Sequence, residues 1–445
     1  MRLSGVSKTN KKVLSNLAWA VAGKTVNLAG TLVLGIIVAR YLGPEQYGLM
    51  NYVFSYVFLF QVLACFGLDN IEIREEAKGS TPYTTVIGTA FWIKTVAGAA
   101  CIGLSVLTAV LIGEDSFTVT LIALYSTYIV FNAFVVIRNY FTSIVENKYV
   151  VMSEIFRTFA GIGIKVVLLL LDCSLIWFVA AFAFDWLLLA GGYVSAYRNR
   201  VGSLREWRFS MPCAKYMLKE SLPLLITNAA VIIYQRIDQV MIGQLLPNKA
   251  NVGYFSVAAK FVEVMIFIPA TLANTISPVL VRLRSSDPDS YRSKSQHFMN
   301  VSLWLSIIIS AMVSLVSYWV ILLTFGEAYL PAVAILQVLS FKTAASALSN
   351  TAGAMLVVEG LQKWVFFRDI LGCLACVALN YWLLPRYGAI AAAFVAIIAN
   401  LVAGYVADAL IPAYRHLFVQ QTKALVLGWR DLVHVRTLLK GNGND

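Results

Sequence analysis

Nine charged side chains lie deep inside long apolar stretches of the sequence, where charge is costly and therefore informative. Six of them are basic, namely Lys24, Arg157, Lys165, Arg236, Lys260 and Lys342, and three are acidic, namely Asp185, Asp238 and Glu263. A charge at the centre of a bilayer costs at least about 2.5 kcal/mol, so such groups usually face a protein interior or a water-filled cavity. The excess of basic groups predicts a cationic cavity that binds an anionic substrate.

Each of these charges also has a structural interpretation, as half of an ion pair or as a long side chain that reaches the lipid head groups. Lys260 and Glu263 are three residues apart, so they share a helix face and can pair. Arg236 and Asp238 are two residues apart and point in different directions, so Asp238 needs a partner from another helix. The three acids are candidates for a site that couples transport to Na⁺ or H⁺, or for structural pairs.

Residues typical of catalysis are scarce. The chain has three histidines, His297, His416 and His434, and all lie outside the long apolar stretches. It contains no HExxH, GxSxG or Walker A motif, and the CxxC formed by Cys373 and Cys376 lies in an apolar stretch, where packing is its expected role. The pattern favours a transporter driven by an ion gradient or the membrane potential, with no metal and no cofactor besides a coupling ion. A membrane polysaccharide polymerase or ligase is the enzymatic alternative.

The elements that must position these charges are membrane-spanning helices. Of 445 residues, 59% are apolar and 13% are charged, about half the charged fraction of a soluble domain. Apolar runs long enough to cross a hydrocarbon core of about 30 Å recur from end to end. We expect an all-α polytopic membrane protein with twelve spans, at residues 14–39, 46–67, 86–110, 118–140, 150–171, 175–197, 220–244, 252–277, 300–324, 331–357, 365–384 and 388–412.

The connections between these spans carry a strong charge bias. With both termini on the cytoplasmic side, the cytoplasmic segments hold 25 Lys and Arg residues, counting Arg138 and Arg368 at the cytoplasmic ends of their spans. The external segments hold three, Arg40, Lys249 and Arg386. Cytoplasmic loops of membrane proteins carry such an excess. The net charge of +12 therefore indicates topology and gives no support for a nucleic-acid partner.

The longest internal connection divides the spans into two sets of six. We expect a cytoplasmic N-terminus at 1–13, a six-helix bundle at 14–197, a cytoplasmic, interfacial linker at 198–219, a second six-helix bundle at 220–412 and a cytoplasmic tail at 413–445. The linker mixes apolar and basic residues, which is typical of a short helix at the membrane interface, although a solvated basic loop is the alternative. Two such halves around a central cavity are a common transporter plan.

Several sequence segments resemble one family of membrane transporters. The runs ARYLGPEQYGLMN (39–51), FGLDN (66–70) and IREEAKG (73–79) look like the N-terminal signature of polysaccharide transporters, the O-antigen and capsule flippases. In the second half, RIDQVMIGQLL (236–246), VGYFSVAAKFVE (252–263) and IPATLANTISPVL (268–280) add to the likeness. The resemblance covers both halves of the chain and places it in the multidrug, oligosaccharidyl-lipid and polysaccharide exporter superfamily.

This resemblance implies two six-helix bundles around a cavity that opens alternately to each membrane face. It implies a substrate, an oligosaccharide repeat unit on undecaprenyl pyrophosphate, turned from the inner to the outer leaflet of the bacterial inner membrane. It also implies membrane lipids and a polysaccharide polymerase with chain-length machinery as partners. An ion-coupled multidrug antiporter of the same superfamily is the alternative, although antiporters of cationic drugs tend to place acids in the cavity.

Overall fold

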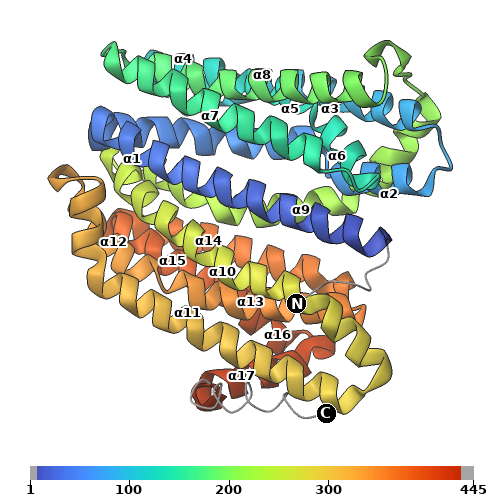
Figure 1. Cartoon of the computed structure of the whole chain (residues 1–445). Helices are drawn as coiled ribbons and strands as arrows, with labels where there is room; N and C mark the ends of the chain where they lie inside the picture. The colour runs from blue at the N-terminus through green and yellow to red at the C-terminus, as the bar shows by residue number, and fades with distance from the viewer. Residues whose placement is uncertain (1–7, 432–445) are drawn as a thin grey trace. The chain divides into compact units, whose positions relative to one another are not determined.

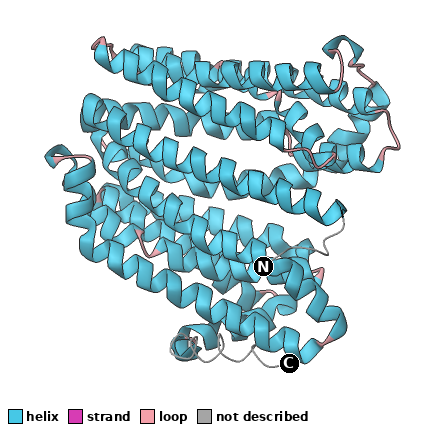
Figure 2. Cartoon of the chain, in the orientation of Figure 1, coloured by secondary structure: helices cyan, strands magenta, loops and turns pink. Residues whose placement is uncertain are grey.

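The computed structural model describes residues 8–431, with the side chains of residues 29–431 except those of residues 224, 226–228, 232 and 274. Within this range the chain is built from helices and their connections, with no strand (Figure 2). Its contacts divide it into two compact units, Met1–Ile232 and Ile233–Asp445. The boundary falls inside one helix, α9 (Met211–Leu245).

The first unit contains eight α-helices before α9 (Figure 1). They are α1 (Lys8–Cys65), α2 (Asp69–Lys78), α3 (Tyr83–Ile112), α4 (Ser116–Ser126), α5 (Tyr128–Asn132), α6 (Val135–Ser143), α7 (Lys148–Leu170) and α8 (Leu175–Arg200), followed by a short 3₁₀ turn, η1 (Leu204–Glu206). Gly43 has φ 71° and ψ 171° and precedes Pro44, so α1 is two helices merged across a kink.

The second unit continues from α9 through eight further α-helices. They are α10 (Ala250–Ser286), α11 (Pro288–Thr324), α12 (Ala332–Leu339), α13 (Lys342–Glu359), α14 (Val365–Tyr387), α15 (Ala389–Leu401), α16 (Ala407–Leu410) and α17 (Arg415–Leu427). A π-helical turn, η4 (Val402–Val406), joins α15 to α16.

Nine helical segments of the described residues are long and apolar enough to cross a membrane. The protein is therefore a multi-pass, all-helical membrane protein. The twelve predicted spans all fall on helices, and the kink of α1 at Gly43 lies between the predicted spans 14–39 and 46–67. Other spans are not single helices as expected: 118–140 is broken into α4, α5 and α6, and 331–357 into α12 and α13. The twelve-span count and the cytoplasmic placement of both termini stay predictions.

The core of the first unit gathers apolar side chains from α2, α3, α6, α7, α8 and α9. Its buried members include Ile71, Ile87, Phe141, Tyr193 and Met217. Because Met217 is fully buried in this core, the first turns of α9 belong to the first unit, although the same helix continues into the second. The helix expected within the linker 198–219 is thus the start of α9, which begins at Met211.

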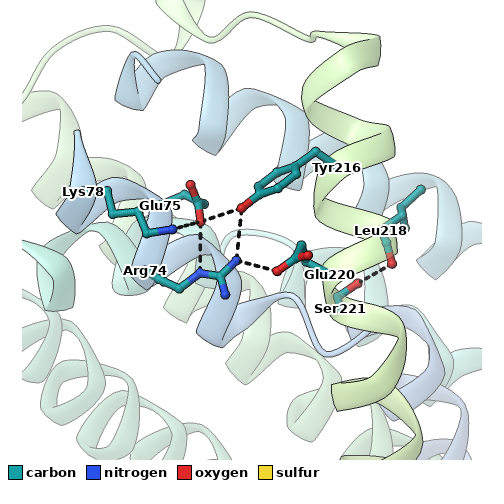
Figure 3. A network of polar contacts seen from close by, with 7 residues as sticks. All are labelled: Arg74, Glu75, Lys78, Tyr216, Leu218, Glu220 and Ser221. Carbon is teal, nitrogen blue, oxygen red and sulfur yellow. Dashed lines mark hydrogen bonds and ion pairs between the residues drawn. The ribbon is translucent and has the colours of Figure 1, made fainter. Parts of the chain in front are cut away.

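Polar contacts hold α2 against this start of α9 (Figure 3). The Arg74 guanidinium lies 3.0 Å from a Glu220 carboxylate oxygen and donates to the Tyr216 hydroxyl at 3.2 Å. Glu75 accepts from Lys78 at 3.0 Å and from Tyr216 at 3.2 Å. The Arg74 and Glu220 side chains are 41% and 39% exposed, so this pair contributes below about 1 kcal/mol and serves mainly to orient α9.

The tail helix α17 packs against α11 in the second unit. Trp304 Nε1 donates to the Ala424 carbonyl at 2.9 Å, and Gln296 donates to the Gln420 carbonyl at 2.9 Å. At its other end, His416 lies 2.7 Å from Glu359, and this hydrogen bond raises the pKa of the imidazole. The predicted tail 413–445 therefore begins with an ordered, packed helix.

Gly88 of α3 marks the closest approach of the linker to the first bundle. A Cβ at this position would lie 2.7 Å from the backbone N and O of Arg208, whereas a Cβ at Gly103 of the same helix would meet nothing within 4 Å. We expect Gly88→Ala to destabilise the protein by about 1–3 kcal/mol, because backbone atoms must move. Gly103→Ala should be neutral or slightly stabilising. Thermal unfolding of both variants in detergent is the measurement, and equal midpoints would contradict the close packing.

Candidate functional site

A cavity of about 740 Å³ lies within the first unit. Residues from α1, α2, α5, α6, α7 and α8 line it, together with Asn147 just before α7. The lining comprises Gln61, Cys65, Asp69, Asn132, Val135, Arg138, Thr142, Asn147, Val150, Val151, Glu154, Arg157, Trp186, Leu189 and Tyr193. Its volume lies within the range of about 300–1,000 Å³ typical of small-molecule sites. We refer to it as the Arg138–Arg157 cavity.

Two guanidinium groups dominate its electrostatics. Neither Arg138 nor Arg157 forms an ion pair with any described residue, and Arg157 Nε is buried without a hydrogen-bond partner among them. A buried hydrogen-bond donor without a partner costs about 1–3 kcal/mol, and more when the group is charged. The cavity therefore holds unused donors suited to an anion, and guanidinium groups bind phosphate oxygens in pairs.

The sequence predicted a substrate-binding role for Arg157 but not for Arg138. Arg138 was counted instead among the basic residues that indicate the cytoplasmic side. The structure places Arg138 within α6, four residues before Thr142, which also lines the cavity. The period of the helix thus brings both to one face. The four-residue spacing of Arg138 and Thr142 is visible in the sequence, but it indicates a shared helix face only if both lie on one helix. The sequence predicted a single span at 118–140, whereas the structure breaks it into three helices.

A charge cluster surrounds Asp69, one of the residues that line the cavity. Lys94 Nζ lies 2.6 Å from both Asp69 Oδ1 and Glu72 Oε1, and Asn139 donates to the same two carboxylates at 3.0 and 2.6 Å. Lys94 is 3% exposed and was missed among the charges inside apolar stretches. Lys94 therefore pairs with this cavity-lining carboxylate, which also interacts electrostatically with Arg138.

Lys165 lies outside the cavity lining. Its ammonium group is 2.7 Å from Asp185 and 4.3 Å from the Phe182 ring centroid, and the whole residue is 1% exposed. Both Lys165 and Asp185 were predicted as functional charges, for substrate and coupling ion respectively. The geometry instead favours the structural alternative, a buried ion pair that joins α7 to α8.

Asp238 in α9 is held from another helix, as its spacing from Arg236 predicts. Asn380 and the Cys376 thiol of α14 donate to Asp238 Oδ1 at 2.6 and 3.3 Å. Asp238 Oδ2 and Asn380 Oδ1 are buried without hydrogen-bond partners among the described residues. The CxxC residue Cys376 therefore does more than pack, because its thiol orients this carboxylate. No group of three or more His, Cys, Asp and Glu in the described range could hold a metal.

The remaining predicted charges lie apart from the Arg138–Arg157 cavity or outside the described side chains. Arg236 pairs with Glu263 at 3.2 Å, and Glu263 also interacts electrostatically with Lys260. Lys260 and Lys342 also lie in the second unit, and Lys342 acts electrostatically on Asp238. The side chain of Lys24 lies outside the described residues.

A second buried ion pair escaped the sequence reasoning. Arg368 of α14, counted as a cytoplasmic loop residue, is 4% exposed and lies 3.6 Å from Asp408. It also donates to the Ala403 carbonyl in the π-helical turn η4 at 2.8 Å. Arg368 thus ties α14 to this π-helical turn.

Comparison with known proteins adds a family and a fold. The model of a family described as polysaccharide biosynthesis protein matches residues 37–334. No curated protein sequence matches the chain. Solved structures match over nearly the whole length: the lipid II flippase MurJ in an inward closed conformation is 14% identical, with a TM-score of 0.71, and the match covers 96% of this chain and 94% of that chain.

Two transporters of the MOP superfamily are also similar. An inward-facing multidrug resistance MATE family transporter is 16% identical, with a TM-score of 0.66, and the match covers 94% of this chain and 96% of that chain. A transporter from Pyrococcus furiosus, described as having a binding pocket of reverse polarity, is 13% identical, with a TM-score of 0.56 and coverage of 93% and 94%. At these identities the likeness establishes the fold alone.

The Lys165–Asp185 pair gives a test of structural against functional charge. Lys165→Met should destabilise the protein by about 3–5 kcal/mol, because it leaves a carboxylate buried and unpaired. Lys165→Met combined with Asp185→Asn should recover most of that loss and keep transport. Unfolding in detergent and a cellular export assay measure the two effects. If the double variant folds but does not transport, the pair is functional and not structural.

Proposed function

We propose that this chain, which belongs to the polysaccharide biosynthesis protein family, is a flippase for a lipid-linked saccharide with an anionic head group. The substrate would be an oligosaccharide repeat unit on undecaprenyl pyrophosphate, moved from the inner to the outer leaflet. The product would serve the synthesis of a surface polysaccharide, such as O-antigen, capsule or exopolysaccharide. The fold shared with flippases and transporters supports this proposal.

The observation that carries the proposal is that neither guanidinium group of the Arg138–Arg157 cavity forms an ion pair with a side chain that the structure describes. Arg157 Nε is buried, and no residue within the described range accepts a hydrogen bond from it, although buried charges in membrane proteins usually pair. A pyrophosphate offers several oxygens to two guanidinium groups and would satisfy those donors. The polyprenyl chain would stay in lipid while the head group occupies the cavity.

The alternative functions fit these residues less well. A cationic drug would face two guanidinium groups, and one of the two cavity carboxylates, Asp69, is already held by Lys94. A multidrug antiporter is therefore the second candidate. A polymerase or ligase is third, because the similar structures are flippases and transporters.

Transport would draw on an ion gradient or the membrane potential through the second unit. Asp238 Oδ2 and Asn380 Oδ1 are buried oxygens that accept no hydrogen bond from any side chain or backbone group that the structure describes. This suits a proton on the carboxylate or a Na⁺ ion between oxygen ligands. We therefore assign the coupling role to Asp238 rather than to Asp185 or Glu263, which are both held by basic residues.

The proposed substrate implies a cellular location and a set of partner proteins. A flippase for undecaprenyl-linked saccharides would reside in the bacterial inner membrane with both termini in the cytoplasm. It would receive its substrate from glycosyltransferases on the cytoplasmic face. It would deliver the flipped unit to a polysaccharide polymerase and its chain-length machinery.

Binding of undecaprenyl pyrophosphate to the purified full chain tests the role of the arginines. We expect Arg138→Gln and Arg157→Gln each to weaken binding about tenfold or more, because each removes a charge-assisted hydrogen bond. Arg205→Gln makes the same charge change at an exposed position outside the cavity and should leave affinity unchanged. If all three variants bind like the unaltered protein, the anionic head group does not occupy this cavity.

Coupling is tested at Asp238. Asp238→Asn keeps the shape of the side chain but removes its charge, so we expect substrate binding to persist while transport loses its response to an imposed H⁺ or Na⁺ gradient. Asp289→Asn, an exposed position in the same unit, is the matched control. Transport by reconstituted protein, measured with and without each gradient, gives the answer. An unchanged gradient response in Asp238→Asn would refute the assignment.

A further inference from the structure

The Arg138–Arg157 cavity contains more than an anion requires. A site for phosphate alone needs donors, yet this lining also carries Trp186, Glu154 and Tyr193, with amide side chains at Gln61, Asn132 and Asn147. A carboxylate placed near a phosphate repels it. The presence of an acidic acceptor and aromatic rings beside the arginines therefore points to a second part of the ligand.

One face of α8 supplies the aromatic part of the lining. Trp186, Leu189 and Tyr193 are spaced at i, i+3 and i+7, which places them on a single helix face. The Trp186 ring packs against Tyr128, with centroids 5.2 Å apart at an interplanar angle of 31°. Tyr128 in turn donates to Gln61, another lining residue, at 3.2 Å. The indole is thus held in place at the cavity wall.

Unused hydrogen-bonding groups lie on the facing helix. Glu154 and Arg157 are three residues apart on α7, a spacing at which opposite charges usually pair, yet no ion pair joins them in the described range. Tyr193 donates to Glu154 Oε1 at 3.1 Å, which orients the carboxylate, and no described residue donates to its other oxygen. The cavity therefore offers acceptors and donors side by side.

Sugars are the ligands that need this combination. A sugar hydroxyl both donates and accepts, so it can bridge a carboxylate and a guanidinium group. The C–H face of a sugar ring is apolar and packs on an aromatic ring. A cavity of about 740 Å³ has room for a pyrophosphate and the sugar attached to it.

We propose that Trp186 and Glu154 form a saccharide subsite that takes the sugar nearest the pyrophosphate. The proposal rests on the function proposed above and extends it. Arg138 and Arg157 bind the anion common to every undecaprenyl pyrophosphate, and the Trp186–Glu154 subsite selects the glycosylated lipid over the bare one. Trp186 and Glu154 are then the residues that set specificity at the first sugar.

The test compares two probes on the purified full chain in lipid nanodiscs. One probe is bare undecaprenyl pyrophosphate. The other is the same lipid with a single sugar attached, prepared separately with glucose, galactose and N-acetylglucosamine. We expect the unaltered protein to bind at least one glycosylated probe more tightly than the bare one. Trp186→Ala should weaken binding of that glycosylated probe about fivefold to tenfold and change binding of the bare probe by less than about twofold.

Matched variants separate a subsite from a folding defect. Trp177 lies on the same helix, is 58% exposed and does not line the cavity, so Trp177→Ala should bind both probes normally. Trp186→Phe keeps an aromatic face and should retain part of the preference even if Trp186→Ala unfolds. Glu154→Gln keeps the size of the side chain and should also reduce the preference, because it replaces a charged acceptor.

The outcomes distinguish this inference from the function on which it rests. Loss of the preference in Trp186→Ala, or a reduced preference in Trp186→Phe, with binding of the bare probe intact, supports the subsite. The subsite is overturned if the unaltered protein binds every glycosylated probe no better than the bare one, or if the Trp186 variants weaken both probes equally. Failure of the unaltered protein to bind any probe overturns the flippase function itself.

Discussion

Unpaired charge in a hydrocarbon environment is expensive, and this constraint organises the structure. Lys94 is held by two carboxylates, Lys165 by Asp185, and Arg368 by Asp408. Each pair or cluster joins different helices, so the cost of burying charge is offset by contacts that fix helix positions. Against this background, we propose that a ligand completes Arg138 and Arg157, which line a cavity and pair with no carboxylate among the described residues.

Both arginines line the same cavity. Arg138 and Arg157 lie on different helices, α6 and α7, and meet at a cavity whose other wall is formed by the face of α8 that bears Trp186. The lining carries two carboxylates, Asp69 and Glu154, beside the two guanidinium groups, and Lys94 pairs with Asp69. The same physical rule therefore explains both the ordered core and the open site: charges are paired where they stabilise helices and left free where a ligand completes them.

The sequence predicted the class of protein and the kind of chemistry better than the identity of the site. Hydropathy identified a multi-pass helical protein, and the family resemblance is confirmed by the match over residues 37–334. Of six basic residues predicted to bind substrate, Arg157 lines the cavity of the first unit. Hydropathy does not reveal contacts between helices. The ion pair of Lys165 with Asp185 and the contacts of Lys94, around which three helices meet, could therefore not be predicted from the sequence. Arg138 was hidden because helix breaks at residues 126–135 cannot be located from composition.

The most direct measurement follows the substrate across a bilayer. Purified full chain in proteoliposomes would be given a fluorescent undecaprenyl-pyrophosphate saccharide, and its arrival in the opposite leaflet would be detected by a membrane-impermeant quencher. We expect transfer in proteoliposomes that is far faster than in protein-free vesicles and no transport of a cationic drug. Transfer at the protein-free rate, or transport of the drug in its place, would contradict the assignment as a flippase for lipid-linked saccharides.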